Sequence, residues 1–157
     1  MGSGESTPFE PVPMAELFKG VQLANKDGNL VDAEQVLKDK IVGLYFSAHW
    51  CPPCRQFTPV LKDFHSDLKE AEEDFEVVFV SFDRTDSDLK KYLAECHGDW
   101  YHVPFGNEKI QELAKKFDVS GIPALIIVKP DGTVVTKNGR NDVQNKPPKS
   151  ALSGWKA

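Results

Sequence analysis

The sequence predicts an α/β domain in which a central mixed β-sheet is flanked by helices on both faces. Residues 41–46, 77–82 and 124–128 are apolar runs that do not alternate with polar residues, which is typical of strands covered on both sides. The segments between these runs have helical periodicity instead. Strands and helices that alternate along the chain, with a hairpin at its end, indicate this fold class.

Helices are expected where apolar residues recur three or four positions apart. A short helix is also expected over residues 33–37, and another after Pro147 and Pro148, ending near Trp155. The main sets of residues with helical spacing are Phe57, Leu61, Phe64 and Leu68; Leu89, Tyr92, Leu93 and Cys96; and Ile110, Leu113, Ala114 and Phe117.

Two hairpins are expected at Asp-Gly turns, because this dipeptide accepts positive φ at little cost. The second of them would complete the sheet. The turns, with the strands they join, are Asp27-Gly28 between residues 21–24 and 30–31, and Asp131-Gly132 between residues 124–128 and 133–136.

The chain of 157 residues has the length of one domain. We expect residues 1–14, with three prolines, to be a flexible lead-in, and residues 15–157 to form the domain. Gly2 followed by Ser6 fits the loose pattern for N-myristoylation. A chance match or an added leader is the favoured alternative, because no polybasic patch is present to assist one acyl chain.

Charge and hydropathy exclude several classes of partner. The net charge is −5, from 24 acidic and 19 basic residues, and no basic block occurs. Nucleic acid and anionic membrane are therefore not expected as partners. No run approaches the roughly 18 apolar residues of a membrane helix, and the N-terminus does not resemble a secretory signal. We expect a cytoplasmic protein, with the nucleus as an alternative, whose three cysteines serve reactivity rather than a disulfide framework.

The chemistry is expected in residues 47–55, which follow a predicted buried strand and open a predicted helix. A helix N-terminus stabilises an anion, so the pKa of Cys51 should be lower than that of a free thiol. Cys54 lies one turn further on, at a spacing that allows a disulfide. Pro52 and Pro53 pre-set helical φ values and stiffen the loop. The pattern predicts a redox-active dithiol.

A zinc site is the structural alternative for this cysteine pair. It would need a second pair of ligands, and Cys96-His97 is the candidate, 42 residues beyond Cys54. That spacing, without a second C-x-x-C, fits the usual zinc patterns poorly. Redox chemistry is therefore favoured, and no metal or other cofactor is expected.

Residues 50–55 (Trp-Cys-Pro-Pro-Cys-Arg) resemble the tryparedoxin and nucleoredoxin branch of the thioredoxin superfamily, and residues 46–50 are closer to nucleoredoxin. The resemblance runs from about Leu17 to Arg140 and implies a thioredoxin fold. Further matching segments are Phe57-Thr58-Pro59, residues 75–81 with Asp83-Arg84, Val103-Pro104-Phe105, and residues 119–123.

The resemblance implies roles for individual residues. Cys51 corresponds to the attacking thiol and Cys54 to the resolving thiol. Pro123 corresponds to the cis-proline that faces the disulfide, and the backbone of Ile122 is expected to pair with a substrate chain. Pro59 matches a proline that kinks the first long helix.

Other residues of the motif are expected at the substrate surface. Trp50 should shield one side of the disulfide and contact substrate, together with Pro52 and Pro53; plain packing is the alternative for Trp50. His49 either holds positive charge near Cys51 and favours the thiolate, or is an exposed loop residue.

The chain departs from its relatives at three places. Tyr45 stands where thioredoxins carry a buried Asp, so proton transfer at Cys54 must use water or another group. Arg84 stands where tryparedoxins tend to have an acidic residue, which argues against their polyamine-linked substrate. Residues 153–155 replace the Phe-Pro-Trp of that branch.

These features predict a protein-disulfide reductase whose partners are disulfide-containing proteins and an external thiol reductant or reductase. The alternative is a redox-dependent interaction module in signalling, with little turnover. Cys96 is expected to be a buried, inert thiol rather than a third redox partner. His65 and His102 are expected to be ordinary surface or core histidines.

Overall fold

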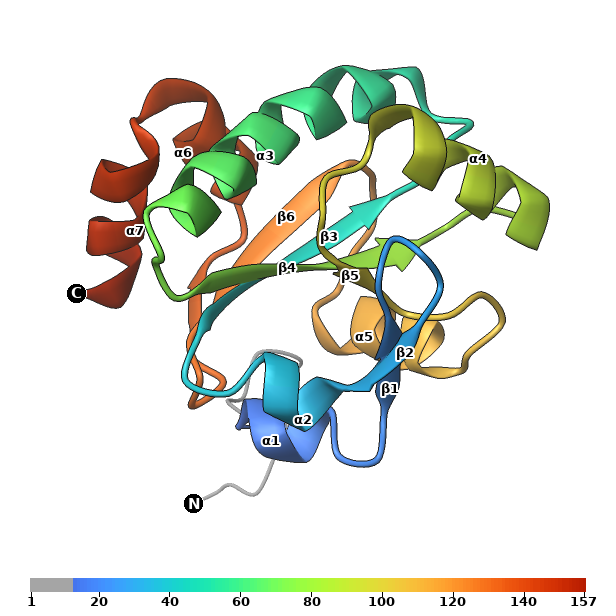
Figure 1. The fold of residues 1–157 in the computed structure, drawn as a ribbon, viewed down its shortest axis with the longest axis horizontal. Coiled ribbons are helices and arrows are strands. Elements are labelled where there is room, and N and C mark those ends of the chain that lie inside the picture. The colour runs from blue at the N-terminus through green and yellow to red at the C-terminus, as the bar shows by residue number, and fades with distance from the viewer. Residues whose placement is uncertain (1–12) are drawn as a thin grey trace.

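The computed structural model describes residues 13–157, which form a mixed seven-stranded sheet with helices on both sides (Figure 1). The strands are β1 (Gln22–Ala24), β2 (Leu30–Asp32), β3 (Ile41–Ser47), β4 (Phe75–Ser81), β5 (Tyr101–His102), β6 (Ala124–Val128) and β7 (Val134–Thr136). The helices are α1 (Met14–Leu17), α2 (Ala33–Val36), α3 (Pro52–Glu70), α4 (Asp86–Cys96), α5 (Lys109–Lys116), α6 (Gly139–Asn145) and α7 (Pro148–Lys156).

Strand β3 lies inside the sheet, whose order is β2-β1-β5-β4-β3-β6-β7. It pairs in parallel with β4 and antiparallel with β6. All seven residues of β3 and all seven of β4 are buried, which explains why their sequences read as continuous apolar runs. The predicted mixed sheet with helices on both faces is confirmed.

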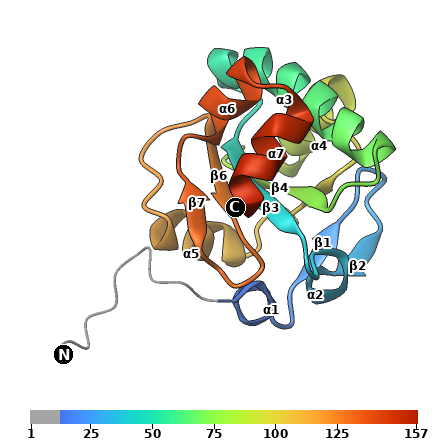
Figure 2. The same cartoon turned by 90° about the vertical axis from the view of Figure 1, so that its left-hand side faces the viewer.

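Two hydrophobic cores fill the spaces on the two sides of the sheet. Helices α3, α4, α6 and α7 cover one face, and α1, α2 and α5 cover the other (Figure 2). Successive residues of β3 enter different cores: Tyr45 packs under α3, while Leu44 and Phe46 face α1, α2 and α5. The alternation of side chains along the strand thus joins both layers to one sheet.

Both predicted hairpins are confirmed, as β1–β2 and β6–β7, and so are the three main helices and the short helix α2. Helix α1, strand β5 and helix α6 were not predicted, and α1 is a single turn of four residues. Strand β5 has only two residues, and α6 has one apolar buried side chain, Val143, so neither presents a periodic pattern.

The described structure begins slightly earlier than the predicted domain. Met14 is buried as the first residue of α1, and its N–H donates to the carbonyl of Pro130 at 3.0 Å. The rest of the predicted lead-in, residues 1–12 with Gly2, lies outside the described residues. None of the helices in the described part of the chain has the length and apolar character to cross a bilayer.

Candidate redox-active site

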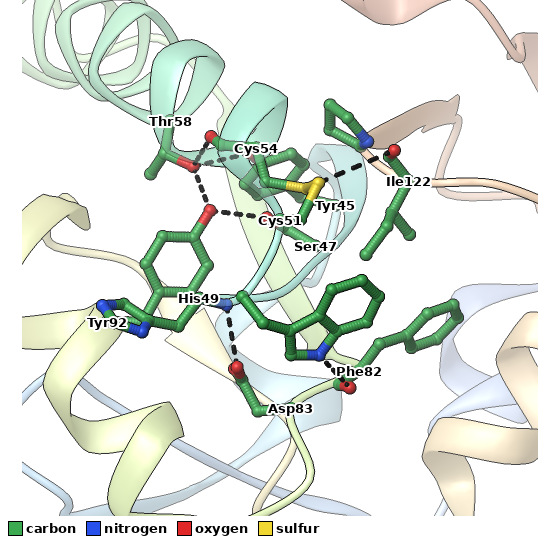
Figure 3. Close-up of a disulfide and its surroundings, with 12 residues drawn as sticks. Tyr45, Ser47, His49, Cys51, Cys54, Thr58, Phe82, Asp83, Tyr92 and Ile122 are labelled. Atoms are coloured by element: carbon green, nitrogen blue, oxygen red, sulfur yellow. Dashed lines mark hydrogen bonds between the residues drawn. A yellow bond between two sulfur atoms is a disulfide. The ribbon is translucent and has the colours of Figure 1, made fainter.

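The cysteine pair lies where β3 ends and α3 begins, at the edge of the sheet formed by the carboxyl ends of β3 and β4 (Figure 3). Cys51 is the N-cap of α3, and Pro52 and Pro53 form its first turn. The Cα atoms of Cys51 and Cys54 are 5.2 Å apart, and their sulfurs are disulfide-bonded. The predicted placement of both cysteines on one turn at a helix start is confirmed.

The two cysteines differ in access to solvent. Cys51 is 5% exposed. Cys54 is 0% exposed, on the side of α3 that faces the core. A second molecule therefore reaches the Cys51 sulfur first.

A loop between α5 and β6 faces the Cys51 sulfur. The Ile122–Pro123 peptide bond is cis, as the resemblance implies. The carbonyl oxygen of Ile122 lies 3.8 Å from Cys51 Sγ. Arg140 holds the loop in place, because its Nη1 donates to the carbonyl of Pro123 at 3.2 Å and its guanidinium lies over the ring of Phe57. The backbone of the loop thus borders the disulfide.

Trp50 stands beside the disulfide and is 46% exposed. Its Nε1 donates to the carbonyl of Phe82 at 3.0 Å (Figure 3). Asp83 follows Phe82 in the loop between β4 and α4. It accepts from the His49 N–H at 2.8 Å and from the Ser81 hydroxyl at 2.7 Å. These bonds fasten the β4–α4 loop to the loop that carries Cys51.

The ring of His49 makes its contacts with α4. Its Nε2 lies 3.0 Å from Oε1 of Glu95, and its ring packs edge-on against Tyr92. Any positive charge on this ring would therefore be shared with a carboxylate. The predicted effect of His49 on Cys51 stays a prediction.

A cluster of four hydroxyls lies beneath Cys54 (Figure 3). Tyr45 and Thr58 lie 2.6 Å apart, as do Ser47 and Tyr92, and Thr58 also contacts Tyr92. Thr58 donates to the carbonyl of Cys54 at 2.8 Å. Burial raises the pKa of Tyr45 and of Tyr92, so both stay neutral. Tyr45 was noted in the sequence, but the hydroxyl groups that it contacts were not predicted. The one local indication was Thr58, because a threonine four residues after Cys54 on a helix can donate to the carbonyl of Cys54.

Cys96 was expected to be buried, and this is wrong: it is half-buried and free. It ends α4, where fewer atoms cover its sulfur. Burial, followed by the charge of Glu95, still raises the pKa of its thiol. An ordinary thiol is less reactive when its pKa is raised.

The remaining histidines belong to the core. His97 is fully buried, its Nδ1 accepts from Trp100 Nε1 at 3.0 Å, and burial keeps its pKa well below the usual value. His65 pairs with Glu76 at 2.8 Å. Burial lowers the pKa of His102 to about 4. Among residues 13–157, no three or more His, Cys, Asp or Glu residues are grouped so that they could hold a metal ion.

The sequence of this chain is similar to those of known thioredoxin-like proteins. The profile of the Thioredoxin-like family matches residues 39–134. Mouse nucleoredoxin is 40% identical over 143 residues, which is 90% of this chain and 32% of that protein. The chain thus spans about a third of the length of this curated relative.

Solved structures show the same relationship over nearly their whole length. A thioredoxin from Wuchereria bancrofti is 52% identical, with a TM-score of 0.76 over 88% of this chain and 95% of that one. Tryparedoxin I from Crithidia fasciculata is 39% identical, with a TM-score of 0.76 over 86% and 92%. The chain belongs to the thioredoxin-like family of oxidoreductases, and its predicted thioredoxin fold and its likeness to nucleoredoxins and tryparedoxins are confirmed.

Proposed function

We propose that this chain is a protein-disulfide reductase in which Cys51 attacks and Cys54 resolves. One observation carries the proposal: of two cysteines paired at a helix N-terminus, Cys51 is the more accessible and faces the cis-proline loop. The positive end of the α3 dipole favours a thiolate at this position in the reduced protein.

The reaction consists of two thiol–disulfide exchanges. The Cys51 thiolate attacks one sulfur of the substrate disulfide; a Cys51–substrate disulfide forms and a substrate thiolate leaves. Cys54 then loses its proton and attacks Cys51 Sγ, which forms the Cys51–Cys54 disulfide and releases the second substrate thiolate. Both substrate thiolates take up protons. The substrate gains two electrons, and an external thiol or dithiol reductant must return two electrons to the protein.

The substrate chain would lie against the cis-proline loop. The backbone of Ile122 would pair with it, since the Ile122 carbonyl lies 3.8 Å from Cys51 Sγ. Pro123, Trp50, Pro52 and Pro53 would form the walls around the reacting sulfurs, with Trp50 as the exposed aromatic contact. A protonated His49 would favour the Cys51 thiolate, and the negative charge of Glu95 beside His49 would weaken this effect.

We assign this activity to a reducing compartment, the cytoplasm with the nucleus as an alternative, because a dithiol reductase needs a supply of reducing equivalents. The proposed partners are disulfide-containing proteins and a thiol reductant or reductase. No cofactor enters the proposed reaction.

Resolution by Cys54 is tested with Cys54→Ser. The variant should retain a mixed disulfide with a protein substrate, visible on a non-reducing gel, and lose turnover with insulin and dithiothreitol by about 1000-fold or more. Cys51→Ser should lose turnover without forming adducts. Adducts with Cys51→Ser and none with Cys54→Ser would reverse the two roles.

The order of thiol reactivity gives a second test. In the reduced protein, brief alkylation at neutral pH followed by mass spectrometry should label Cys51 before Cys96, whose thiol pKa is raised by burial. Faster labelling of Cys96 would contradict the assignment of the attacking thiol.

A redox-dependent interaction module is the second candidate function. It is favoured by the exposed aromatic side chains of Trp50 and Phe105 and by a surface pocket of about 530 Å³ that includes Phe82 and Phe105. Such a module would hold a partner through this surface, which combines aromatic with polar side chains, and release it when the disulfide changes state. It would barely accelerate insulin precipitation, whereas a reductase would accelerate it strongly.

A further inference from the structure

Two of the three arginines of the chain contact residues that border the disulfide, and the third is adjacent to Cys54 in sequence, although the chain carries a net charge of −5. Arg55 directly follows Cys54 in the first turns of α3. Arg84 lies over the ring of Trp50, with its guanidinium carbon 5.1 Å from the ring centroid. Arg140 donates to the carbonyl of Pro123 and is thereby part of the cis-proline loop. The other 16 basic residues are lysines.

The loop that carries Arg84 is fastened at two points, and one ring supports the guanidinium itself. This loop is fastened to the redox loop by the bond from Trp50 to Phe82 at 3.0 Å. The bond from the His49 N–H to Asp83 at 2.8 Å fastens the neighbouring position. The indole of Trp50 then supports the planar guanidinium. Trp50 directly precedes Cys51 in the chain, so the guanidinium that lies over its ring is close to the disulfide.

Neither Arg84 nor Arg55 forms an ion pair within the described protein. No carboxylate of residues 13–157 lies within ion-pair distance of either guanidinium, and both side chains are exposed.

Three acidic groups near Arg84 in sequence or in space have other partners. Asp83 accepts from the His49 N–H and the Ser81 hydroxyl. Glu95 pairs with His49, and Asp86 pairs with Lys90 at 3.1 Å. The guanidinium groups of Arg84 and Arg55 therefore have no ion-pair partner among residues 13–157 and can bind a carboxylate of an approaching molecule.

We propose that Arg84 selects substrates whose disulfide is flanked by acidic residues, so that the partner is an acidic polypeptide segment. This inference rests on the proposed reductase function and names its substrate class. A guanidinium binds a carboxylate through two parallel hydrogen bonds, which an ammonium does not reproduce. A substrate that places its sulfur on Cys51 brings the residues next to its own cysteines over Trp50 and Arg84. Arg84 is the specificity-determining residue in this arrangement.

The expected preference is moderate, because both arginines are exposed. An exposed ion pair changes an equilibrium by about twofold to fivefold, and salt weakens it. Complementary charge acts mainly on the rate of productive encounter. A substrate with acidic flanks should therefore react about fivefold faster than one with basic flanks at low ionic strength.

The test uses three synthetic peptides that share one intramolecular disulfide and differ in the flanking residues, which are Asp, Ser or Lys. The pre-reduced protein is mixed with each peptide, and the second-order rate constant of its oxidation is measured at 20 mM and at 500 mM NaCl. This single turnover needs no reductant. The readout is the ratio of the rate constants for the Asp and Lys peptides. If a variant is partly unfolded, both rate constants fall by the same factor and the ratio is unchanged.

The variants are Arg84→Glu, Arg84→Ala and the control Lys38→Glu. Lys38 is exposed and precedes β3, at the opposite edge of the sheet from Cys51, and its substitution makes the same change in net charge as Arg84→Glu. Wild type and Lys38→Glu should favour the Asp peptide about fivefold at low salt and lose most of this preference at 500 mM. Arg84→Ala should reduce the ratio by about half or more, and Arg84→Glu should invert it.

Several results would overturn the proposal. Equal rates for the Asp and Lys peptides in wild type would do so, as would an unchanged ratio in Arg84→Glu. If Lys38→Glu changed the ratio of rate constants as much as Arg84→Glu does, the net charge of the protein, and not the position of Arg84 beside the disulfide, would determine the selection. In each of these cases the reductase function stands, because the Ser peptide still oxidises the protein. If none of the three peptides oxidises it, the proposed function itself is wrong.

Discussion

The two ends of helix α3 bury polar side chains in different ways. Beneath its first turns, hydroxyl groups including those of Tyr45, Thr58 and Tyr92 satisfy one another, and Thr58 also binds the carbonyl of Cys54. Further along the helix, His65 Nε2 lies 2.8 Å from a carboxylate oxygen of Glu76, and both side chains are buried. Neutral groups thus lie under the redox pair, while the acid–base pair lies at a distance from it along α3.

This difference has a physical consequence for the thiols. A buried carboxylate beside Cys54 would titrate and would place a negative charge near a thiolate, whereas the neutral hydroxyls do not titrate in the physiological range. The Glu76 carboxylate lies where β4 begins, at the opposite end of the strands from the cysteines. The polar groups next to the cysteines are thus hydroxyls, and the buried carboxylate lies away from them.

Tyr45→Asp should break this comparison most strongly. It places a carboxyl group in a fully buried strand position and removes an aromatic ring from the core. We expect a loss of unfolding free energy of at least about 3 kcal/mol, measured by urea titration. Because desolvation raises the pKa of the new carboxyl, kcat/KM for disulfide reduction should gain a second ionisation between pH 5 and 9. A profile identical to wild type would show that this position does not communicate with the thiols.

Acid should destabilise the protein through a third buried group, His102. Its pKa is lowered to about 4 in the folded protein by burial, against about 6.5 when unfolded. The unfolded chain binds the extra proton between these values, so the contribution is full above pH 6.5 and is lost as pH falls toward 4. His102 should account for about 3 kcal/mol of this loss.

The control for the acid prediction is His102→Gln, which cannot titrate. Urea unfolding at pH 7, 5.5 and 4.5 should show a flatter decline for this variant than for wild type. Parallel declines would assign the acid sensitivity to other groups, of which His97, with its lowered pKa, is the first to examine.

Glu76→Leu should separate stability from reactivity. It leaves His65 Nε2 and the N–H of Val77 without the carboxylate that they contact at 2.8 and 3.1 Å. We expect a loss of about 2 kcal/mol in unfolding free energy and no change in the rate at which Cys51 is alkylated. A changed alkylation rate would mean that the far end of α3 does influence the thiol.

Tyr45→Phe is the smallest expected change. It removes one hydroxyl from the cluster and leaves Thr58 bonded to the carbonyl of Cys54. The cost should be about 1 kcal/mol in stability, with a pH profile of kcat/KM close to that of wild type. A strong second ionisation in wild type that disappears in Tyr45→Phe would give this hydroxyl a role in proton transfer.

The amino-acid sequence by itself determined the features that depend on near neighbours. The strand runs, the Asp-Gly hairpins, and the position of Cys51 and Cys54 on one helical turn all follow from residues a few positions apart. Such features are set by backbone geometry and local periodicity, which are the same in any fold. Half-exposed Cys96 shows the limit of periodicity, since it lies on the apolar side of α4 but at its last residue.

Only the tertiary structure decided which distant groups meet at the site. Ile122 is 71 residues from the Cys51 sulfur that it faces, a contact that the resemblance to known proteins implied but that no local pattern predicts. Tyr92 is 34 residues from Thr58, and this contact was not predicted. Arg84 reaches Trp50 because β4 lies parallel to β3, so that the loops at their carboxyl ends share one edge of the sheet. These contacts arise when strands pair and helices pack, and that pairing leaves no periodic trace in either segment alone.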